Sequence, residues 1–173
     1  MGFSVHVASV ATLVTTNSPI EEGSTLRAIR RLLLGALVLG TVGTTAELIF
    51  IGHYENPFQY TPLILLGTGL LSLGWHLAAP GAAALRALQV VMLLFTLSGA
   101  VGIGLHFHGN EEFELEMYPT RSGLELIWKT LSGATPVLAP GSMTLLGVIG
   151  LAHTYRHPSA GNRAPGTSRG VIS

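Results

Sequence analysis

The chain has 173 residues, of which 48% are hydrophobic and only 10% are charged, whereas roughly 25% of the residues of soluble proteins are charged. This composition excludes a globule covered by charged side chains and predicts an integral membrane protein. Nine basic and nine acidic side chains cancel, so net charge indicates no nucleic acid partner, and the lack of cysteine excludes disulfides and thiolate metal sites.

The two ends of the chain are predicted to lie outside the membrane domain. Residues 1–26 include an apolar run, residues 3–14, that is too short to span a bilayer and lacks the pattern of a signal peptide. We expect this segment to be a loose or interfacial arm. Residues 158–173 are rich in Gly, Pro, Ser and Arg, a composition typical of a disordered tail on the cytoplasmic side.

Four apolar stretches approach or reach the roughly 20 residues that cross about 30 Å of hydrocarbon. They are residues 32–52, 61–79, 82–105 and 137–155. Lipid offers the backbone no hydrogen bonds, so spans of this length are predicted to be helices. The only charged residues in them are Glu47 and Arg86, and Arg86 lies near a span end. We therefore expect an all-α, up-down-up-down four-helix bundle over residues 27–157.

The basic residues predict the orientation of this bundle. Seven arginines fall on one side of the four spans, and only Arg121 and Lys129 fall on the other. Because basic residues favour the cytoplasmic side, both termini are expected on the cytoplasmic side of a membrane, which we expect to be a bacterial inner membrane. The seven are Arg27, Arg30, Arg31, Arg86, Arg156, Arg163 and Arg169.

The outer loop, residues 106–134, is expected to contain a short amphipathic helix over residues 122–132. Ser122 and Glu125 have the spacing of a capping box. Apolar side chains follow at i, i+3, i+4 and i+7, and an indole among them suits the headgroup boundary, so this helix is predicted to lie on the outer membrane surface. These side chains are Leu124, Ile127, Trp128 and Leu131.

Small residues predict which helix faces pack together. One face of the first span carries Ala36, Gly40, Gly43 and Glu47. The third span has a matching row, Thr96, Ala100 and Gly104, which leads to His108 and Glu112. Small residues allow close helix approach, so these faces are expected to pack, with Leu33 and Leu37 off the face. Glu47 is then expected to contact His106 or His108, because a carboxylate at membrane depth needs a donor.

The outer ends of the first and third spans concentrate the residue types that bind metals. Imidazole and carboxylate ligands together suit iron, copper, zinc or manganese, and His108 and Glu112 share a helix face if the helix continues past Leu105. We call the candidate ligands the outer set: Glu47, His53, Glu55, His106, His108 and Glu112. Solvated helix ends and proton handling are the alternative roles for these side chains.

A second group of histidines supports a haem alternative. His76 and His153 lie at similar depths near the cytoplasmic ends of the second and fourth spans, as two axial ligands of haem b would. His53 and His106 would form an outer pair. An interface anchor beside Trp75 is the alternative role of His76.

Three functional hypotheses follow. The first is a small membrane protein without catalysis, packed in the bilayer alone, as a homo-oligomer or as an accessory subunit of a larger membrane complex. The second is a metal-binding or redox protein that uses the outer set, and the third is a haem protein. No phosphate loop, nucleophile elbow or basic aromatic stripe is present, so nothing predicts an enzyme of those classes or a nucleic acid partner.

Overall fold

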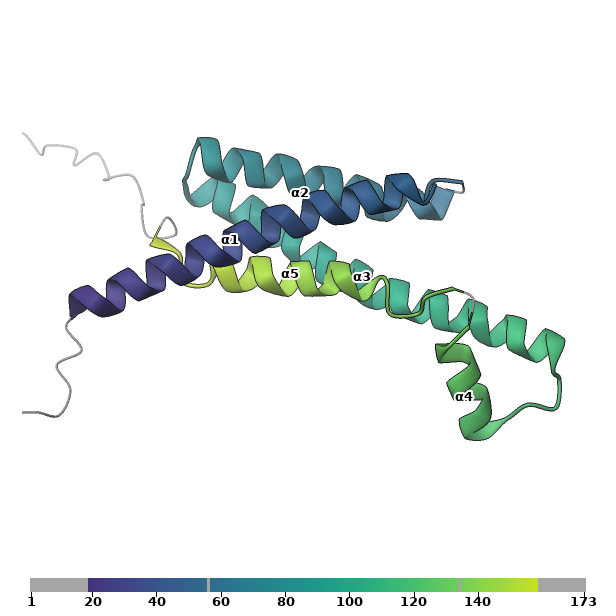
Figure 1. Ribbon diagram of the computed structural model, residues 1–173. Helices are drawn as coiled ribbons and strands as arrows, with labels where there is room; N and C mark the ends of the chain where they lie inside the picture. The colour runs from purple at the N-terminus through teal and green to yellow at the C-terminus, as the bar shows by residue number, and fades with distance from the viewer. Residues whose placement is uncertain (1–18, 56, 134, 159–173) are drawn as a thin grey trace, which may run out of the picture. The chain divides into compact units, whose positions relative to one another are not determined.

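The computed structural model describes residues 19–55, 57–133 and 135–158. These residues form α-helices and one 3-10 turn, and no strand occurs among them (Figure 1). The prediction of an all-α fold is therefore confirmed. The elements are α1 (Pro19–Phe50), η1 (Pro57–Gln59), α2 (Tyr60–Ala78), α3 (Ala82–Met117), α4 (Gly123–Leu131) and α5 (Gly141–Thr154).

Three helical stretches are long and apolar enough to cross a membrane, as expected of an integral membrane protein. They are Gly23–Phe50, Pro57–Ala78 and Ala82–Met117. The sequence predicts a fourth crossing at residues 137–155, but α5 has 14 residues and is only about 21 Å long. Pro136 and Pro140 have no N–H to donate, so a series of tight turns precedes α5 in place of further helix.

The chain divides into two units, residues 1–32 and residues 33–173, and α1 runs through the boundary between them. In the first unit α1 begins at Pro19, where the missing N–H of proline costs no helical hydrogen bond. This start lies inside the segment that the sequence predicts to be a loose arm. Residues 1–18 of that arm, and the predicted tail from residue 159 onward, lie outside the described residues.

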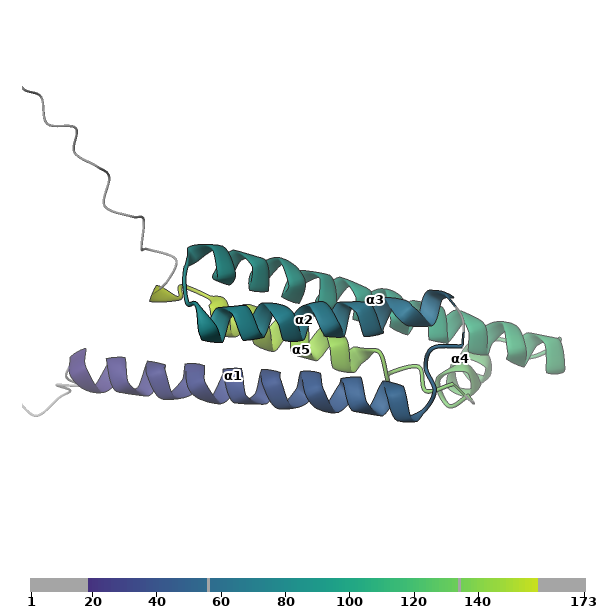
Figure 2. The same ribbon diagram turned by 90° about the horizontal axis from the view of Figure 1, so that it is seen from above.

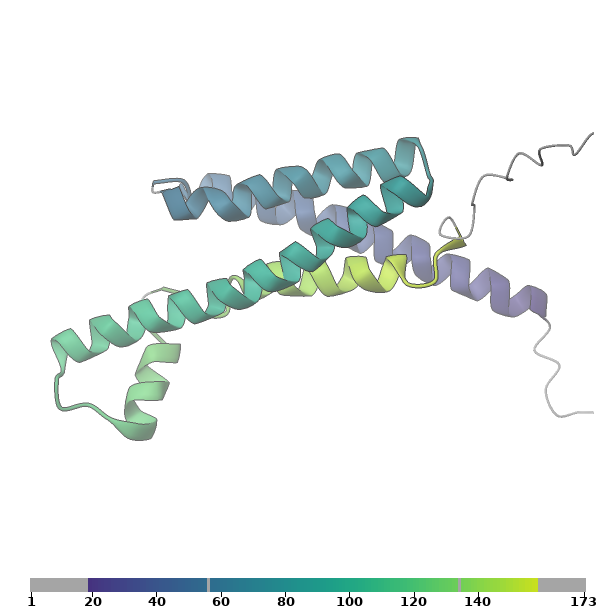
Figure 3. The ribbon, with the colours of Figure 1, turned by 180° about the vertical axis from the view of Figure 1, so that it is seen from behind.

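In the second unit α3 is the central helix, and it packs against α2, α5 and α4. Figure 2 shows α3 beside α2, and Figure 3 shows α3 running along α5 and on past it toward the segment that carries α4. A hydrophobic core joins α2, α3 and α5 to the second half of α1. Its fully buried members include Leu37, Leu66, Leu88, Met92 and Phe95.

The backbones of α3 and α5 approach each other closely at glycines. A Cβ on Gly99 would lie 2.7 Å from the carbonyl oxygen of Pro140, and one on Gly147 would lie 2.6 Å from the backbone nitrogen of Thr96. The Thr144 hydroxyl donates to the carbonyl of Thr96 at 3.3 Å. The α3 row that the sequence predicts is therefore only partly right, because Thr96 faces α5 while Ala100 and Gly104 are exposed.

The predicted packing face of α1 is wrong for most of its length. Ala36, Gly43 and Glu47 are exposed, and only Gly40 lies against a partner, the side chain of Leu146. Leu37, which the sequence places off the face, is fully buried. At this interface α1 presents a large apolar side chain together with hydroxyl groups that donate hydrogen bonds to carbonyls of the same helix. Small residues therefore do not mark the packing face of α1.

The outer part of α3 continues through Gly109 to Met117 and is tied to the segment after α4. The buried Asn110 amide donates to the carbonyl oxygens of Thr130 at 2.9 Å and Thr135 at 2.7 Å. It also accepts a hydrogen bond from the N–H of Thr135 at 3.2 Å. These bonds fix the α4–α5 connection against α3.

Helix α4 forms where the sequence predicts it, but without the capping box. Ser122 precedes the helix and makes no capping hydrogen bond with its side chain. Glu125 instead accepts a hydrogen bond from Nε of Arg121 at 3.0 Å, and Arg121 also pairs with Glu114. The carboxylate that a capping box needs is therefore used to join α4 to the end of α3.

Candidate metal centre

His76 and His153 come together because α2 and α5 end at the same end of the second unit (Figure 2). Each lies in the last turn of its helix. Their side chains are 5% and 3% exposed, so both imidazoles are buried. The sequence predicts similar depths for this pair, and the structure brings the two rings into contact.

The two buried rings contact each other through their Nε2 atoms, in a hydrogen bond whose donor depends on the tautomers. Nε2 of His153 lies 3.4 Å from Nε2 of His76, and the ring planes are at 82° to each other. The ring of His157 lies 5.3 Å from that of His76 and 5.5 Å from that of His153, between centroids. One ligand nitrogen from each of the three lies within 4.8 Å of the others. We call these residues the histidine trio.

The backbone after α5 places the third ring. The helix ends at Thr154, and the N–H of His157 then donates to the carbonyl of Thr154 at 3.2 Å, which closes a tight turn. Arg156, inside this turn, has a φ of 46°. The chain is therefore bent back so that His157, half-buried, stands beside the two buried histidines.

One nitrogen of the trio is unsatisfied within the described part of the chain. Nδ1 of His76 is buried and has no hydrogen-bond partner there. Most buried polar atoms in proteins are hydrogen-bonded. The unsatisfied Nδ1 is not the nitrogen that contacts His153, which is Nε2. Buried neutral imidazoles that face one another can share a proton or bind a cation, whereas two imidazolium charges at this distance would repel each other strongly.

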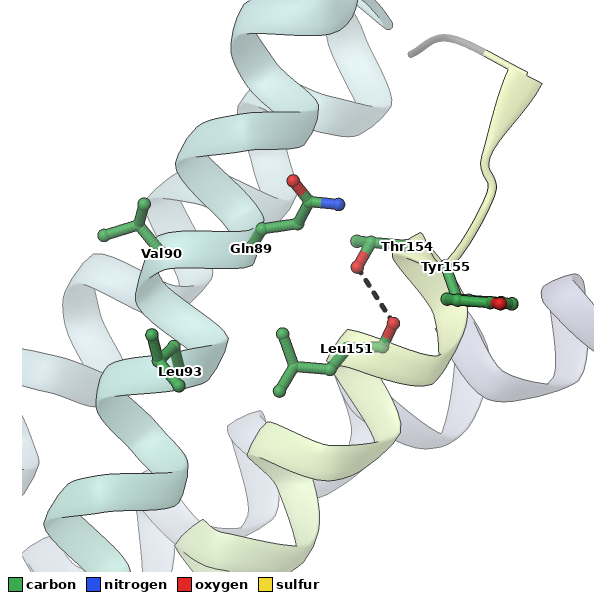
Figure 4. Close-up of a pocket in the computed structure, with 6 residues that line it drawn as sticks. All are labelled: Gln89, Val90, Leu93, Leu151, Thr154 and Tyr155. Atoms are coloured by element: carbon green, nitrogen blue, oxygen red, sulfur yellow. Dashed lines mark hydrogen bonds between the residues drawn. The ribbon is translucent and has the colours of Figure 1, made fainter.

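A shallow groove of about 330 Å³ lies between α3 and α5 next to the end of α5 (Figure 4). Its lining is mostly apolar, with the amide of Gln89 on one side and Thr154 and Tyr155 on the other. The Thr154 hydroxyl donates to the carbonyl of Leu151 at 3.0 Å. None of the trio lines the groove, so the two features are separate.

Part of the outer set pairs locally along α3. Nε2 of His108 lies 3.3 Å from a carboxylate oxygen of Glu112, and Nδ1 lies 3.8 Å from Glu111. The predicted shared face of His108 and Glu112 is thus confirmed, but their side chains are 64% and 65% exposed. An ion pair so open to solvent is weak and gives no enclosed site.

His106 and His53 lie in a more protected setting. Nδ1 of His106 donates to the carbonyl of Pro136 at 3.0 Å, which leaves Nε2 as the acceptor nitrogen of the neutral ring. Burial lowers the pKa of His53 below its ordinary value of 6.5, and the nearby His106 lowers this pKa further. The outer pair that the sequence predicts is therefore close in space.

The acidic members of the outer set do not join these histidines. Glu47 is exposed and forms no hydrogen bond or ion pair with any described residue, so the expected contact with His106 or His108 is not made. Glu55 is exposed, and its backbone N–H donates to Gln59 at 2.7 Å. Among the described residues the histidine trio is the one group of three ligand atoms close enough to hold an ion. Metal binding by the outer set stays a prediction.

Sequence reasoning misses His157. The signal is present, because His153 and His157 are four residues apart, a spacing that recurs in metal sites. The residue falls beyond the predicted span, at the last position of the predicted membrane domain. Only the turn at the end of α5 places it beside the other two histidines.

Comparison of the chain with protein-family models, with curated proteins and with solved structures found no match.

Proposed function

We propose that this chain is a membrane-embedded helical protein that binds one transition-metal ion through the histidine trio. The observation that carries this proposal is the convergence of three imidazole nitrogens within 4.8 Å, two of them on buried rings. Imidazole is the ligand that zinc and copper share, and iron also accepts it. Three protein ligands leave a fourth position open for water or another ligand.

The spacing of the buried pair supports a single ion between the rings. Metal–nitrogen bonds of about 2.05 Å at a tetrahedral angle place two ligand nitrogens about 3.35 Å apart. The Nε2 atoms of His76 and His153 are 3.4 Å apart. A ligand nitrogen of His157 lies within 4.8 Å of a nitrogen on each of the two buried rings.

The same spacing favours an ion over haem. Axial nitrogens on opposite sides of a haem iron are about 4 Å apart, with the whole macrocycle between the two rings. His76 and His153 meet edge to face at 3.4 Å, and both are buried in packed helices. The haem alternative has no support from this arrangement.

The topology that we propose places the trio at the cytoplasmic end of a four-helix bundle in a bacterial inner membrane. Arg86 and Arg156 flank the helix ends that carry the histidines, and basic residues favour that side. Both termini are then cytoplasmic. The exposed apolar side chains of α4, among them Leu124 and Trp128, support an interfacial position of this helix on the outer membrane surface.

A test compares two histidine positions in the full-length protein in detergent. Wild type should carry or take up about one equivalent of Zn²⁺ or Co²⁺ by elemental analysis, and the Co²⁺ form should show tetrahedral d–d absorption. His76→Ala and His153→Ala should abolish both signals. His108→Ala, which removes an exposed imidazole from the outer set, is the matched control and should change neither.

Each alternative outcome has a definite meaning. No ion in wild type, or an ion unaffected by His76→Ala, contradicts the proposal. Loss of the ion only in His108→Ala would assign it to the outer set, and a Soret band in the purified protein would assign haem.

A second candidate function is that of a packing subunit without a metal role. Helix α1 supports it, because Leu39 and Phe50 in its second half are exposed and Glu47 lies among them without a described partner. A neighbouring membrane subunit or a second copy of the chain could cover this surface. The native mass in a mild detergent separates a monomer from either assembly.

A further inference from the structure

The turn that follows α5 holds its backbone in a conformation that its sequence disfavours. Tyr155 has φ −61° and ψ 124°, Arg156 has φ 46°, and the N–H of His157 donates to the carbonyl of Thr154. These features define a type II β-turn, whose third residue needs a positive φ and is usually glycine. Here that residue is arginine.

The backbone of Arg156 is unusual among the described residues. It is the single non-glycine residue with positive φ in the part of the chain that the structure describes. Its side chain is exposed, so packing of a buried group does not impose the backbone angle. Left-handed backbone costs a residue with a Cβ roughly 1–2 kcal/mol. Such strain is typical of functional sites, where surrounding interactions offset it.

We propose that this turn opens and closes, and that Arg156 is the positioning residue that sets how much of the time it is closed. This inference rests on the metal site proposed above. His76 and His153 belong to packed helices and form a fixed pair. His157 reaches the pair only while the turn is closed. The ion is therefore held by two fixed ligands and one removable ligand, and it exchanges through the open turn.

The apparent metal affinity equals the affinity of the closed form multiplied by the fraction of molecules whose turn is closed. A residue that accepts positive φ should raise that fraction, and a residue that resists it should lower it. Glycine accepts positive φ without a penalty, alanine carries the Cβ penalty, and β-branched valine is the least suited of the three. The turn thus predicts an order of affinities from backbone preference alone.

The experiment measures the Co²⁺ affinity of Arg156→Gly, Arg156→Ala and Arg156→Val in the full-length protein. All three variants remove the guanidinium, which lies 5.9 Å from the centre of the Tyr155 ring, so charge does not differ among them. The Gly variant should bind about fivefold more tightly than the Ala variant, and the Val variant more weakly than both. Release of Co²⁺ to a chelator should be slowest in the Gly variant.

The same series in a His157→Ala background is the control. Without the third ligand the turn no longer affects the ion, so the three variants should bind Co²⁺ equally. Equal affinities while His157 is present would overturn the closure, as would the same order after its removal. A failure of the metal site itself looks different, because wild type would then bind no Co²⁺ or would bind it independently of His76.

Discussion

The histidine trio and the outer set show two ways in which one chain uses ligand-type side chains. The outer set has more of them along the sequence, yet its His108–Glu112 pair is formed within one helix and is open to solvent. The trio draws one histidine each from α2, α5 and the turn after α5, and two of the three are buried. Convergence from separate elements, and not density along the sequence, makes the candidate site.

The largest effect should come from separating α5, which carries His153, from α3. Gly147→Leu would place a side chain against the backbone of α3, where a Cβ already meets the carbonyl oxygen of Met92 at 2.5 Å. We expect a loss of about 3 kcal/mol or more in the free energy of unfolding, and loss of bound Co²⁺ with it. Gly104→Leu is the control, because a Cβ on Gly104 meets no atom within 4 Å. Equal melting temperatures for the two variants in detergent would contradict this packing.

Acid should release the ion from the trio. Only neutral imidazole binds a metal, so each histidine that takes up a proton competes with the ion. Co²⁺ affinity should therefore fall at least tenfold between pH 7 and pH 5. Titration of the Co²⁺ absorption at several pH values measures this. A Co²⁺ affinity that does not change over that pH range would point to carboxylate ligands. The trio would then not differ from the outer set in the kind of ligand that holds the ion.

Asn110 should matter for the outer end alone. Asn110→Ala leaves the carbonyl and the N–H of Thr135 without their partner and removes one of two donors to the Thr130 carbonyl, at a cost of about 2 kcal/mol in stability. Proteolysis of the α4–α5 connection should become faster, while Co²⁺ binding by the trio should stay at the wild-type level. Loss of the metal in this variant would show that the two ends are coupled.

The smallest effect concerns His53. Its pKa in the folded chain is lowered, so between that pKa and the ordinary value of 6.5 the unfolded chain binds more protons. The free energy of unfolding should therefore rise with pH through this window. Below the window the loss of stability caused by the lowered pKa should be complete. His53→Gln should flatten this part of the profile, as measured by melting temperature from pH 5 to 8.

Composition predicts the helical fold because the bilayer leaves long apolar segments no other structure. The limits of α2, Tyr60–Ala78, differ by one residue at each end from the predicted span. The packing face of α1 could not be found from small residues, because Leu37 fills the interface and Thr41 satisfies its own hydroxyl by donating to the Leu37 carbonyl at 2.7 Å. Helix faces depend on the neighbours, which one sequence does not show.

The site was predictable in part. His76 and His153 are identified from their depth in the spans, since depth follows from the sequence number in a helix. Their distance, which separates an ion from haem, depends on how α2 and α5 pack against α3. His157 depends on the turn at Arg156, and a positive φ at arginine is what sequence rules predict least.

The unequal lengths of α3 and α5 have a consequence for the membrane itself. The 36 residues of α3 extend about 54 Å, whereas the 14 residues of α5 extend about 21 Å, and the two helices are packed together. No single bilayer thickness suits both: α3 must tilt or project into the headgroups, while lipid beside α5 must thin or admit water to the turns at Pro136 and Pro140. The protein should therefore be more stable in lipids with short acyl chains than in lipids with long ones.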